Sequence, residues 1–173
     1  MEIIKLSKDN LSAVGYKTAY KSKRYLDIVP AECGFLFEYK EFEEEKEFCL
    51  EDEFFSDWLE SPSAYGAFED DKMLGYVEGS IETWNNRYRI SNICVFDTDS
   101  RSKGIGTALM ERIMRDAEES GARMVVLETQ TCNDKAIAFY RKHGFEIIGF
   151  DLYAYSNNDP ERHEIRIEMG KII

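Results

Sequence analysis

A glycine-rich turn joins a continuously apolar segment to an amphipathic one near the middle of the chain. The apolar segment covers residues 93–96, as expected for a strand covered on both faces of a sheet. After the turn, apolar residues recur at helical spacing over 104–120, and Gly121 is a natural residue to end that helix. Gly104 and Gly106 allow the backbone to approach a ligand closely, and a helix start offers unpaired N–H groups. The segment predicts a strand–turn–helix unit able to hold a diphosphate.

The turn matches neither of two common nucleotide-binding loops. The chain has no GxxxxGK[ST] spacing, and Leu109 stands where GxGxxG requires its third glycine. A glycine-rich connection between a strand and a helix is also often a turn and nothing more. The diphosphate cradle and the plain turn both stay open at this point.

The segments around the turn predict one α/β domain with a mixed sheet and helices on its faces. Short-period apolar patterns and turn residues predict strands at 2–6, 65–69, 73–84, 88–96, 124–129, 145–155 and 164–172. Helical spacing predicts helices at 8–20, over 35–60 (one helix or two, ending before Pro62), at 104–120 and at 133–143. The strands before the glycine turn are expected to be antiparallel.

Length and composition indicate a globular protein of one domain, residues 1–173. Of its residues 43% are hydrophobic and 13% aromatic, which suffices for an ordinary core. No stretch approaches the roughly 18 apolar residues of a membrane span, and the start lacks the pattern of a secretory signal. The four cysteines form no CxxC pair, so neither a metal site nor a disulfide framework is expected. We therefore expect a cytoplasmic protein with reduced thiols, no bound metal and no membrane partner.

The negative charge is concentrated in residues 38–71. That segment holds fourteen acids and two lysines, and the net charge of the whole chain is −12. Such a field repels nucleic acid and raises the local concentration of cations. The segment is either a solvated helix face or a wall that attracts a polycationic substrate.

Residues downstream of the glycine turn form a longer motif together with it. Arg101-x-x-Gly104-x-Gly106, followed by Asn133, Phe139-Tyr140 and Gly144-Phe145, resembles the acyl-CoA-binding signature of the GNAT acetyltransferase superfamily. The resemblance covers residues 65–155. Four short blocks are more narrowly similar to the streptothricin acetyltransferases: residues 75–78, 84–87, 127–130 and 149–153.

The resemblance implies a GNAT fold. Its mixed, mostly antiparallel central sheet is flanked by helices, and two splayed strands form the acyl-CoA slot. Residues 1–64 would form acceptor-side helices, and 65–173 the acyl-CoA-binding core. The co-substrate would be acetyl-CoA, and the cofactor contacts would be Val95, Phe96, Arg101, Ser102, Lys103, Gly104, Ile105, Gly106, Thr107, Asn133 and Tyr140.

Two residues have implied roles in the chemistry. Tyr140 matches the general acid of the family, although a tyrosine on a helix face can also be a core aromatic. Glu128 is proposed as the base in relatives, and a structural role is the alternative. The Val95 N–H could polarise the thioester carbonyl, and Asn133 could instead cap a helix.

The acceptor is expected to be a cationic small-molecule amine, with streptothricin as the preferred substrate. Glu78, Glu82 and Trp84 are the candidate residues to bind it. In relatives the strand before the loop often carries acids, whereas this chain has Ser91 and Asn92 there. Acetylation of a protein N-terminus or lysine, and a CoA-binding module without catalysis, are the alternatives. Dimers are common among relatives, so a homodimer is expected.

Overall fold

The computed structural model describes the chain except residues 12–13 and 97–102, and it divides into two compact units. The first unit comprises Met1–Ala19, Cys49–Val126 and Ile172–Ile173. The second comprises Tyr20–Phe48 and Leu127–Lys171. The strand β7 (Met124–Gln130) contributes residues to both units.

The first unit is built on an antiparallel sheet. Its hydrogen-bonded order is β1 (Glu2–Lys5), β4 (Ser63–Glu69), β5 (Lys72–Glu82) and β6 (Arg87–Val95), and β6 then pairs in parallel with the start of β7. Seven successive residues of β5 are buried, since both faces of this central strand are covered. The antiparallel order predicted for the strands at 65–69 and 73–84 is confirmed, and Asp70 and Asp71, which both have positive φ, form the two-residue connection between them.

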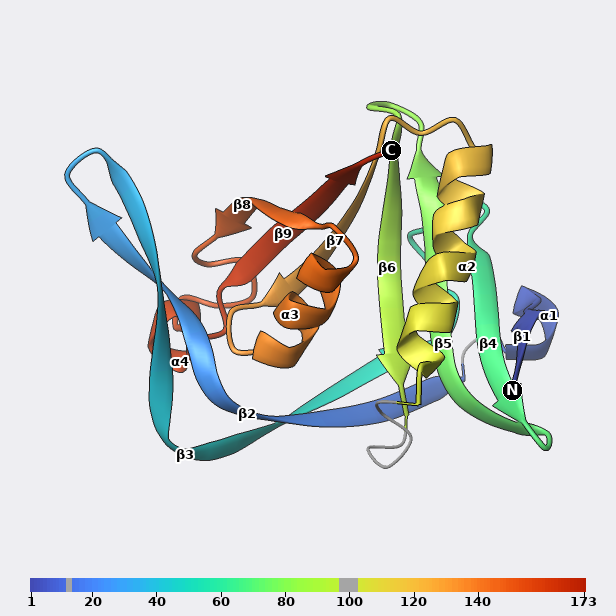
Figure 1. The fold of residues 1–173 in the computed structure, drawn as a ribbon, viewed down its shortest axis with the longest axis horizontal. Helices are drawn as coiled ribbons and strands as arrows, with labels where there is room; N and C mark the ends of the chain where they lie inside the picture. The colour runs from blue at the N-terminus through green and yellow to red at the C-terminus, as the bar shows by residue number, and fades with distance from the viewer. Residues whose placement is uncertain (12–13, 97–102) are drawn as a thin grey trace. The chain divides into compact units, whose positions relative to one another are not determined.

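The helix α2 (Ile105–Glu119) packs on β4, β5 and β6 (Figure 1). Its buried residues recur at helical spacing and form one apolar stripe: Ile105, Leu109, Met110, Ile113 and Ala117. The chain leaves the helix through Gly121 with φ +71°. Both the helix and its end agree with the sequence prediction.

The second unit combines three strands and two helices. The strand β9 (Arg166–Ile172) lies between β7 and β8 (Glu146–Asp151), and β8 and β9 are antiparallel. The helix α3 (Asp134–Lys142) follows β7, as predicted. The segment between the strands predicted at 145–155 and 164–172 contains the short helix α4 (Asp159–Arg162).

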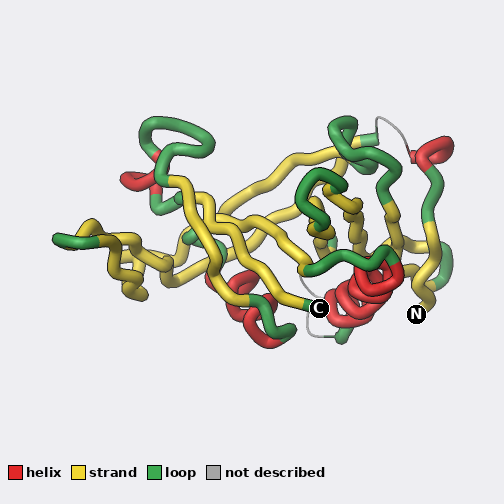
Figure 2. Tube along the Cα trace, turned by 90° about the horizontal axis from the view of Figure 1, so that it is seen from above, coloured by secondary structure: helices red, strands yellow, loops and turns green. Residues whose placement is uncertain are grey.

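Of the helices predicted within residues 1–64, the one at 8–20 is confirmed for its first turn only, as far as the described residues show, and the one over 35–60 is wrong. The helix α1 (Lys8–Leu11) spans four residues, and the strands β2 (Gly15–Ala31) and β3 (Gly34–Glu53) form a two-stranded sheet instead (Figures 1 and 2). Aromatic residues pair across these strands. The ring centroids of Tyr25 and Phe42 lie 4.7 Å apart, and those of the stacked rings of Tyr20 and Phe48 lie 5.1 Å apart.

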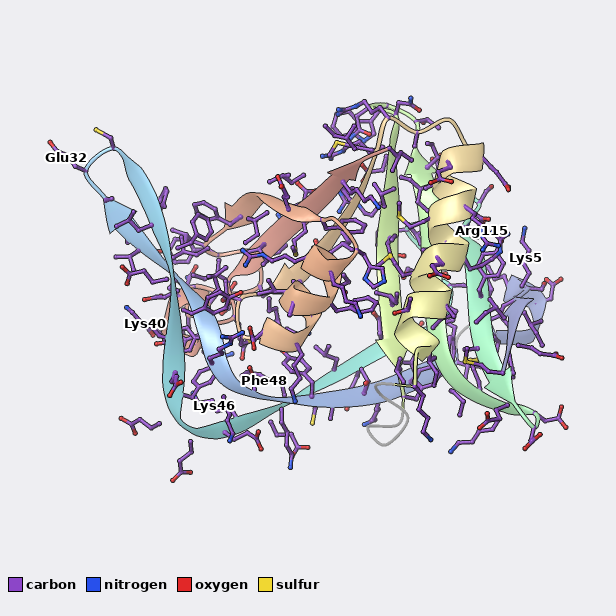
Figure 3. The ribbon with its side chains drawn as sticks, viewed as in Figure 1. Lys5, Glu32, Lys40, Lys46, Phe48 and Arg115 are labelled. Atoms are coloured by element: carbon purple, nitrogen blue, oxygen red, sulfur yellow. The ribbon has the colours of Figure 1, made fainter. Side chains whose placement is uncertain are left out.

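The charge pattern of β3 does not by itself decide between a helix and a strand. A helix would place glutamates of the run 41–47 at i, i+4 positions, and a strand places Glu41, Glu43, Glu45 and Glu47 on one face, so like charges crowd in both. The strand carries nine acids and only two lysines, Lys40 and Lys46 (Figure 3), and most of its side chains are exposed. The acidic segment is therefore largely a solvated strand rather than a helix face.

No helix in the described part of the chain is long and apolar enough to cross a membrane. Likewise, the described residues contain no group of three or more His, Cys, Asp or Glu placed to hold a metal ion.

Candidate active site

The start of α2 presents backbone donors without a side-chain cap. Gly104 occupies the N-cap position with φ +83°, and a Cβ there would meet open space. Ala108 N–H donates to Gly104 C=O at 2.9 Å, so the N–H groups of Ile105, Gly106 and Thr107 precede the first helical hydrogen bond. The first turn has no acidic residue. This is the geometry of an anion-binding helix start.

The other residues predicted for the cradle are only partly described. Lys103 is exposed, as is Gly104 beside it. The predictions for Arg101 and Ser102 fall on residues outside the described part of the chain.

At the end of β6, the backbone N–H groups of Val95 and Phe96 point in opposite directions. Phe96 N–H donates to Leu74 C=O at 3.0 Å, which commits this N–H to β5. Backbone groups alternate in direction along an antiparallel strand, so Val95 N–H points to the opposite edge of β6. The predicted role in binding the cofactor arm therefore suits Val95 N–H and does not suit Phe96 N–H.

In the second unit, α3 carries Tyr140. The side chain is 7% exposed, and its ring centroid lies 5.6 Å from that of Phe139 and 6.2 Å from that of Phe145. Phe145 N–H donates to Tyr140 C=O at 3.1 Å, and Gly144 with φ +86° allows the chain to turn back there. This packing orients the ring, and it suits both the predicted general acid and a core aromatic.

Asn133 begins α3. Its Oδ1 accepts a hydrogen bond from Ala136 N–H at 3.3 Å, which is the geometry of a helix N-cap. The alternative role as a cap is therefore confirmed. A contact with the cofactor arm stays a prediction, and it would fall to the Nδ2 amide.

Glu128 lies exposed on β7 within a polar group of the second unit. Arg166 Nη1 lies 3.6 Å from Glu128 Oε2, and the Tyr155 hydroxyl donates to Glu128 Oε1 at 3.5 Å. The same guanidinium also reaches Asp151 at 3.6 Å. Burial and the charge of Glu128 raise the pKa of Tyr155. The arrangement leaves the Glu128 carboxylate exposed, so an amine or a bridging water could reach it.

Two of the predicted acceptor-binding residues, Glu82 and Trp84, lie around the turn between β5 and β6. Arg89 Nε and Arg87 Nε lie 2.5 Å and 3.3 Å from the Glu82 carboxylate. Burial alone would raise the pKa of Glu82, but hydrogen bonds from Arg89 and Asn85 and the two arginine charges lower it. Trp84 is 82% exposed, and the Arg87 guanidinium lies 5.9 Å from its ring. Glu82 is thus neutralised within the protein.

Glu78 is fully buried in the first unit. Within the described part of the chain, its carboxylate accepts hydrogen bonds from neutral groups: Ser56 N–H, Ser56 Oγ, Tyr76 OH, Ser91 Oγ and Asn92 Nδ2. Five donors fill the roughly four lone-pair sites of a carboxylate. In this conformation Glu78 has no capacity left for an acceptor amine.

Sequence reasoning missed the donors around Glu78. Tyr76 could have been found, because residues two apart in a strand share a face. Ser56 could not, since it lies 22 residues from Glu78 in a loop where a helix was predicted.

The fold and the start of α2 define a family. The model of the acetyltransferase (GNAT) family matches residues 33–145, and the chain belongs to this family. The predicted resemblance and the fold class, a mixed and mostly antiparallel sheet flanked by helices, are both confirmed.

Within the family, the similar curated proteins include two streptothricin acetyltransferases. That of Escherichia coli is 35% identical over 105 residues, which is 61% of this chain and 59% of the relative. Streptothricin acetyltransferase A of Bacillus subtilis (strain 168) is 35% identical over 108 residues, 62% of this chain and 61% of the relative. The matches thus span about three fifths of these relatives.

Solved structures support the fold over nearly the whole chain. The crystal structure of nourseothricin acetyltransferase superposes with a TM-score of 0.78 at 24% identity, covering 99% of this chain and 97% of that one. A protein from Bacillus anthracis str. Ames, solved in complex with acetyl coenzyme A, superposes with a TM-score of 0.79 at 22% identity and the same coverage.

Proposed function

We propose that this protein is an N-acetyltransferase that moves an acetyl group from acetyl-CoA to a primary amine of a cationic small molecule. The uncapped, glycine-led start of α2 carries the proposal, because it supplies the backbone donors that a CoA diphosphate needs. The preceding end of β6 is half-buried, and not fully covered on both faces as the apolar run at 93–96 predicts. Membership of the GNAT family supports the reaction class.

The preferred acceptor is a streptothricin-type antibiotic, which the enzyme would inactivate. Two relatives at 35% identity bear streptothricin in their names. The net charge of −12 and the exposed acids of β3 favour a cationic acceptor. Glu78 and Glu82 are already satisfied by protein groups, so the exposed acids are the better candidates to attract it.

The reaction would be a direct transfer. A neutral amine attacks the thioester carbonyl, a C–N bond forms, and the C–S bond breaks to release a thiolate. The amine proton would pass to Glu128, and the Tyr140 hydroxyl would protonate the departing sulfur. Val95 N–H would stabilise the negative charge that develops on the carbonyl oxygen.

A second candidate is acetylation of a protein N-terminus. N-alpha-acetyltransferase 50 of Danio rerio is 31% identical over 114 residues, which is 63% of this chain and 67% of the relative. This activity would require a groove for an extended peptide instead of a pocket for a small molecule.

A thiol-release assay tests the proposal. Acetyl-CoA would be offered with streptothricin, an aminoglycoside, a polyamine and a ribosomal-protein N-terminal peptide. Turnover with streptothricin alone is the expected result, and turnover with the peptide alone would select the second candidate. Acetyl-CoA binding by calorimetry without turnover on any amine would instead indicate a CoA-binding module. Size-exclusion chromatography with light scattering would test the predicted homodimer.

A further inference from the structure

We propose that Glu78 is a positioning residue that holds β6 so that Val95 N–H is aimed at the thioester carbonyl. The inference rests on the proposed function and deepens it. It assigns to Glu78 a task inside the first unit in place of direct contact with the acceptor.

The first observation is the saturation of a buried charge. A carboxylate removed from water is costly unless hydrogen bonds replace its hydration. Here the shortest bonds come from Ser56 Oγ at 2.5 Å and the Tyr76 hydroxyl at 2.7 Å. Each of these neutral donors replaces part of the lost hydration, so the loss of any one of them makes the buried carboxylate less stable. Glu78 therefore joins the segments that carry them into one rigid group.

The second observation is that Glu78 holds β6 at an irregularity. Glu78 pairs with Asn92 and Gly79 with Ile90, so Ser91 is an extra residue of β6. Ser91 Oγ donates to Glu78 Oε1 at 3.1 Å, and Asn92 Nδ2 donates to the same oxygen at 3.0 Å. The carboxylate thereby holds the bulge, and the bulge determines which backbone groups of β6 face away from β5.

The third observation is that the same carboxylate anchors the segment after β3. Ser56 bonds Glu78 through both its N–H and its hydroxyl. Phe55, with φ +58°, donates its N–H to the Tyr76 hydroxyl at 3.0 Å. A phenylalanine in this left-handed conformation is strained and persists only where its surroundings hold it. Tyr76 and Glu78 supply that hold.

The anchored segment reaches the end of β6 through an aromatic cluster. Phe54 packs against Tyr76 with ring centroids 4.7 Å apart and against Tyr16 at 4.8 Å. The ring of Phe96 lies 5.5 Å from Tyr16 and 6.1 Å from Phe54. Phe96 directly follows Val95, so this cluster holds β6 on the far side of Val95.

Val95 consequently lies between two anchors that share one carboxylate. Ser91 and Asn92 hold β6 before it, and the aromatic cluster holds Phe96 after it. A donor that stabilises a developing charge must be oriented before the reaction starts. Glu78 provides this orientation without touching acetyl-CoA or the acceptor.

The test compares Glu78→Gln with Glu69→Gln, which alters an exposed carboxylate of the first unit. We expect Glu78→Gln to lower kcat by roughly 10- to 100-fold, because small misplacement of a reacting group costs about that much. KM for acetyl-CoA should change little, since the start of α2 is intact. Glu69→Gln should have the kcat and the KM for acetyl-CoA of the wild type.

A second readout needs no substrate. In ¹⁵N-labelled protein without ligand, the amide resonance of Val95 should move in Glu78→Gln and stay in place in Glu69→Gln. If Glu78→Gln does not fold, Ser56→Ala removes the hydroxyl donor, keeps the backbone N–H, and should shift the same resonance.

These readouts separate the possible failures. An unchanged Val95 resonance in a folded variant would overturn the positioning role, even if kcat fell. A lower melting temperature together with a wild-type kcat would show that Glu78 stabilises the fold only, and this result would also overturn the positioning role. Absence of transfer by the wild type would refute the proposed function, while the ligand-free resonance would still decide whether Glu78 positions Val95.

Discussion

Arg166 pairs with Glu128 across the second unit, with Nη1 of the guanidinium 3.6 Å from Oε2 of the carboxylate. The pair leaves Glu128 exposed on β7, twelve residues before Tyr140 on α3. The ion pair restricts the orientation of the carboxylate, and its exposure leaves it within reach of an amine or a bridging water.

If Glu128 is the base, Glu128→Gln should lower kcat by about 100-fold or more, because general base catalysis contributes factors of that order. Steady-state kinetics would measure the effect. Asp151→Asn is the matched control, since Asp151 shares Arg166 with Glu128 and has no assigned role in the reaction. Equal loss in the two variants would indicate that the Arg166 group is structural.

Replacement of Tyr140 by Phe removes the hydroxyl and keeps the ring that packs near Phe139 and Phe145. Turnover should fall roughly 10- to 1000-fold, in the range of lost acid catalysis, because the thiolate would leave unprotonated. Acetyl-CoA affinity, measured by calorimetry, should be nearly unchanged. Tyr153→Phe, at an exposed site, serves as the control. Full turnover in Tyr140→Phe would leave Tyr140 as a core aromatic.

At the start of α2, Gly106→Val should abolish acetyl-CoA binding. The added side chain would occupy space that the diphosphate needs beside the first helical N–H groups. Calorimetry would measure binding, and circular dichroism would confirm that the variant folds. The control is Gly149→Val on β8, where an added Cβ meets no atom within 4 Å. Wild-type affinity in Gly106→Val would contradict the placement of the cradle.

The buried thiol of Cys132 should make the protein less stable at high pH. Burial raises the pKa of its thiol from 9.0 to about 11, and Tyr20 OH lies 3.3 Å from its sulfur. The native state therefore keeps a proton that the unfolded state releases, so the free energy of unfolding falls as pH rises from 9.0 to about 11.

Urea unfolding at about pH 8 and about pH 10.5 would measure this loss, of roughly 2 kcal/mol, as a difference between the wild type and Cys132→Ala. The alanine variant should be less stable at the lower pH and lose less on going to the higher one. Cys33→Ala, at an exposed thiol, should follow the wild type. An identical pH dependence in wild type and Cys132→Ala would refute the prediction.

Elements whose residues interact locally could be predicted. The stripe of α2, its end at Gly121 and the Asp70–Asp71 turn each depend on neighbours a few residues apart. The GNAT signature also lies in such local segments, so the family and the positions of Gly104, Asn133 and Tyr140 followed from it. Asn133 was identified both as a cap and as a possible ligand, and the structure confirms the cap.

Residues 15–53 could not be predicted in the same way. The spacing of Phe48 with Phe54 and Trp58, which follow β3, is compatible with a helix, and the pairing of β2 with β3 is what excludes a helix over residues 35–53. Strand pairing is decided by contacts between residues far apart in sequence, such as Tyr25 with Phe42.

The sequence by itself determined the family, the glycine-led helix start and the candidate acid and base, because these depend on residue type and short spacing. The tertiary structure alone decided that Glu82 is neutralised by Arg87 and Arg89 and that Glu78 is buried among Ser56, Tyr76, Ser91 and Asn92. The same carboxylate can bind a substrate amine or hold two segments together, and the choice depends on which donors the fold brings to it.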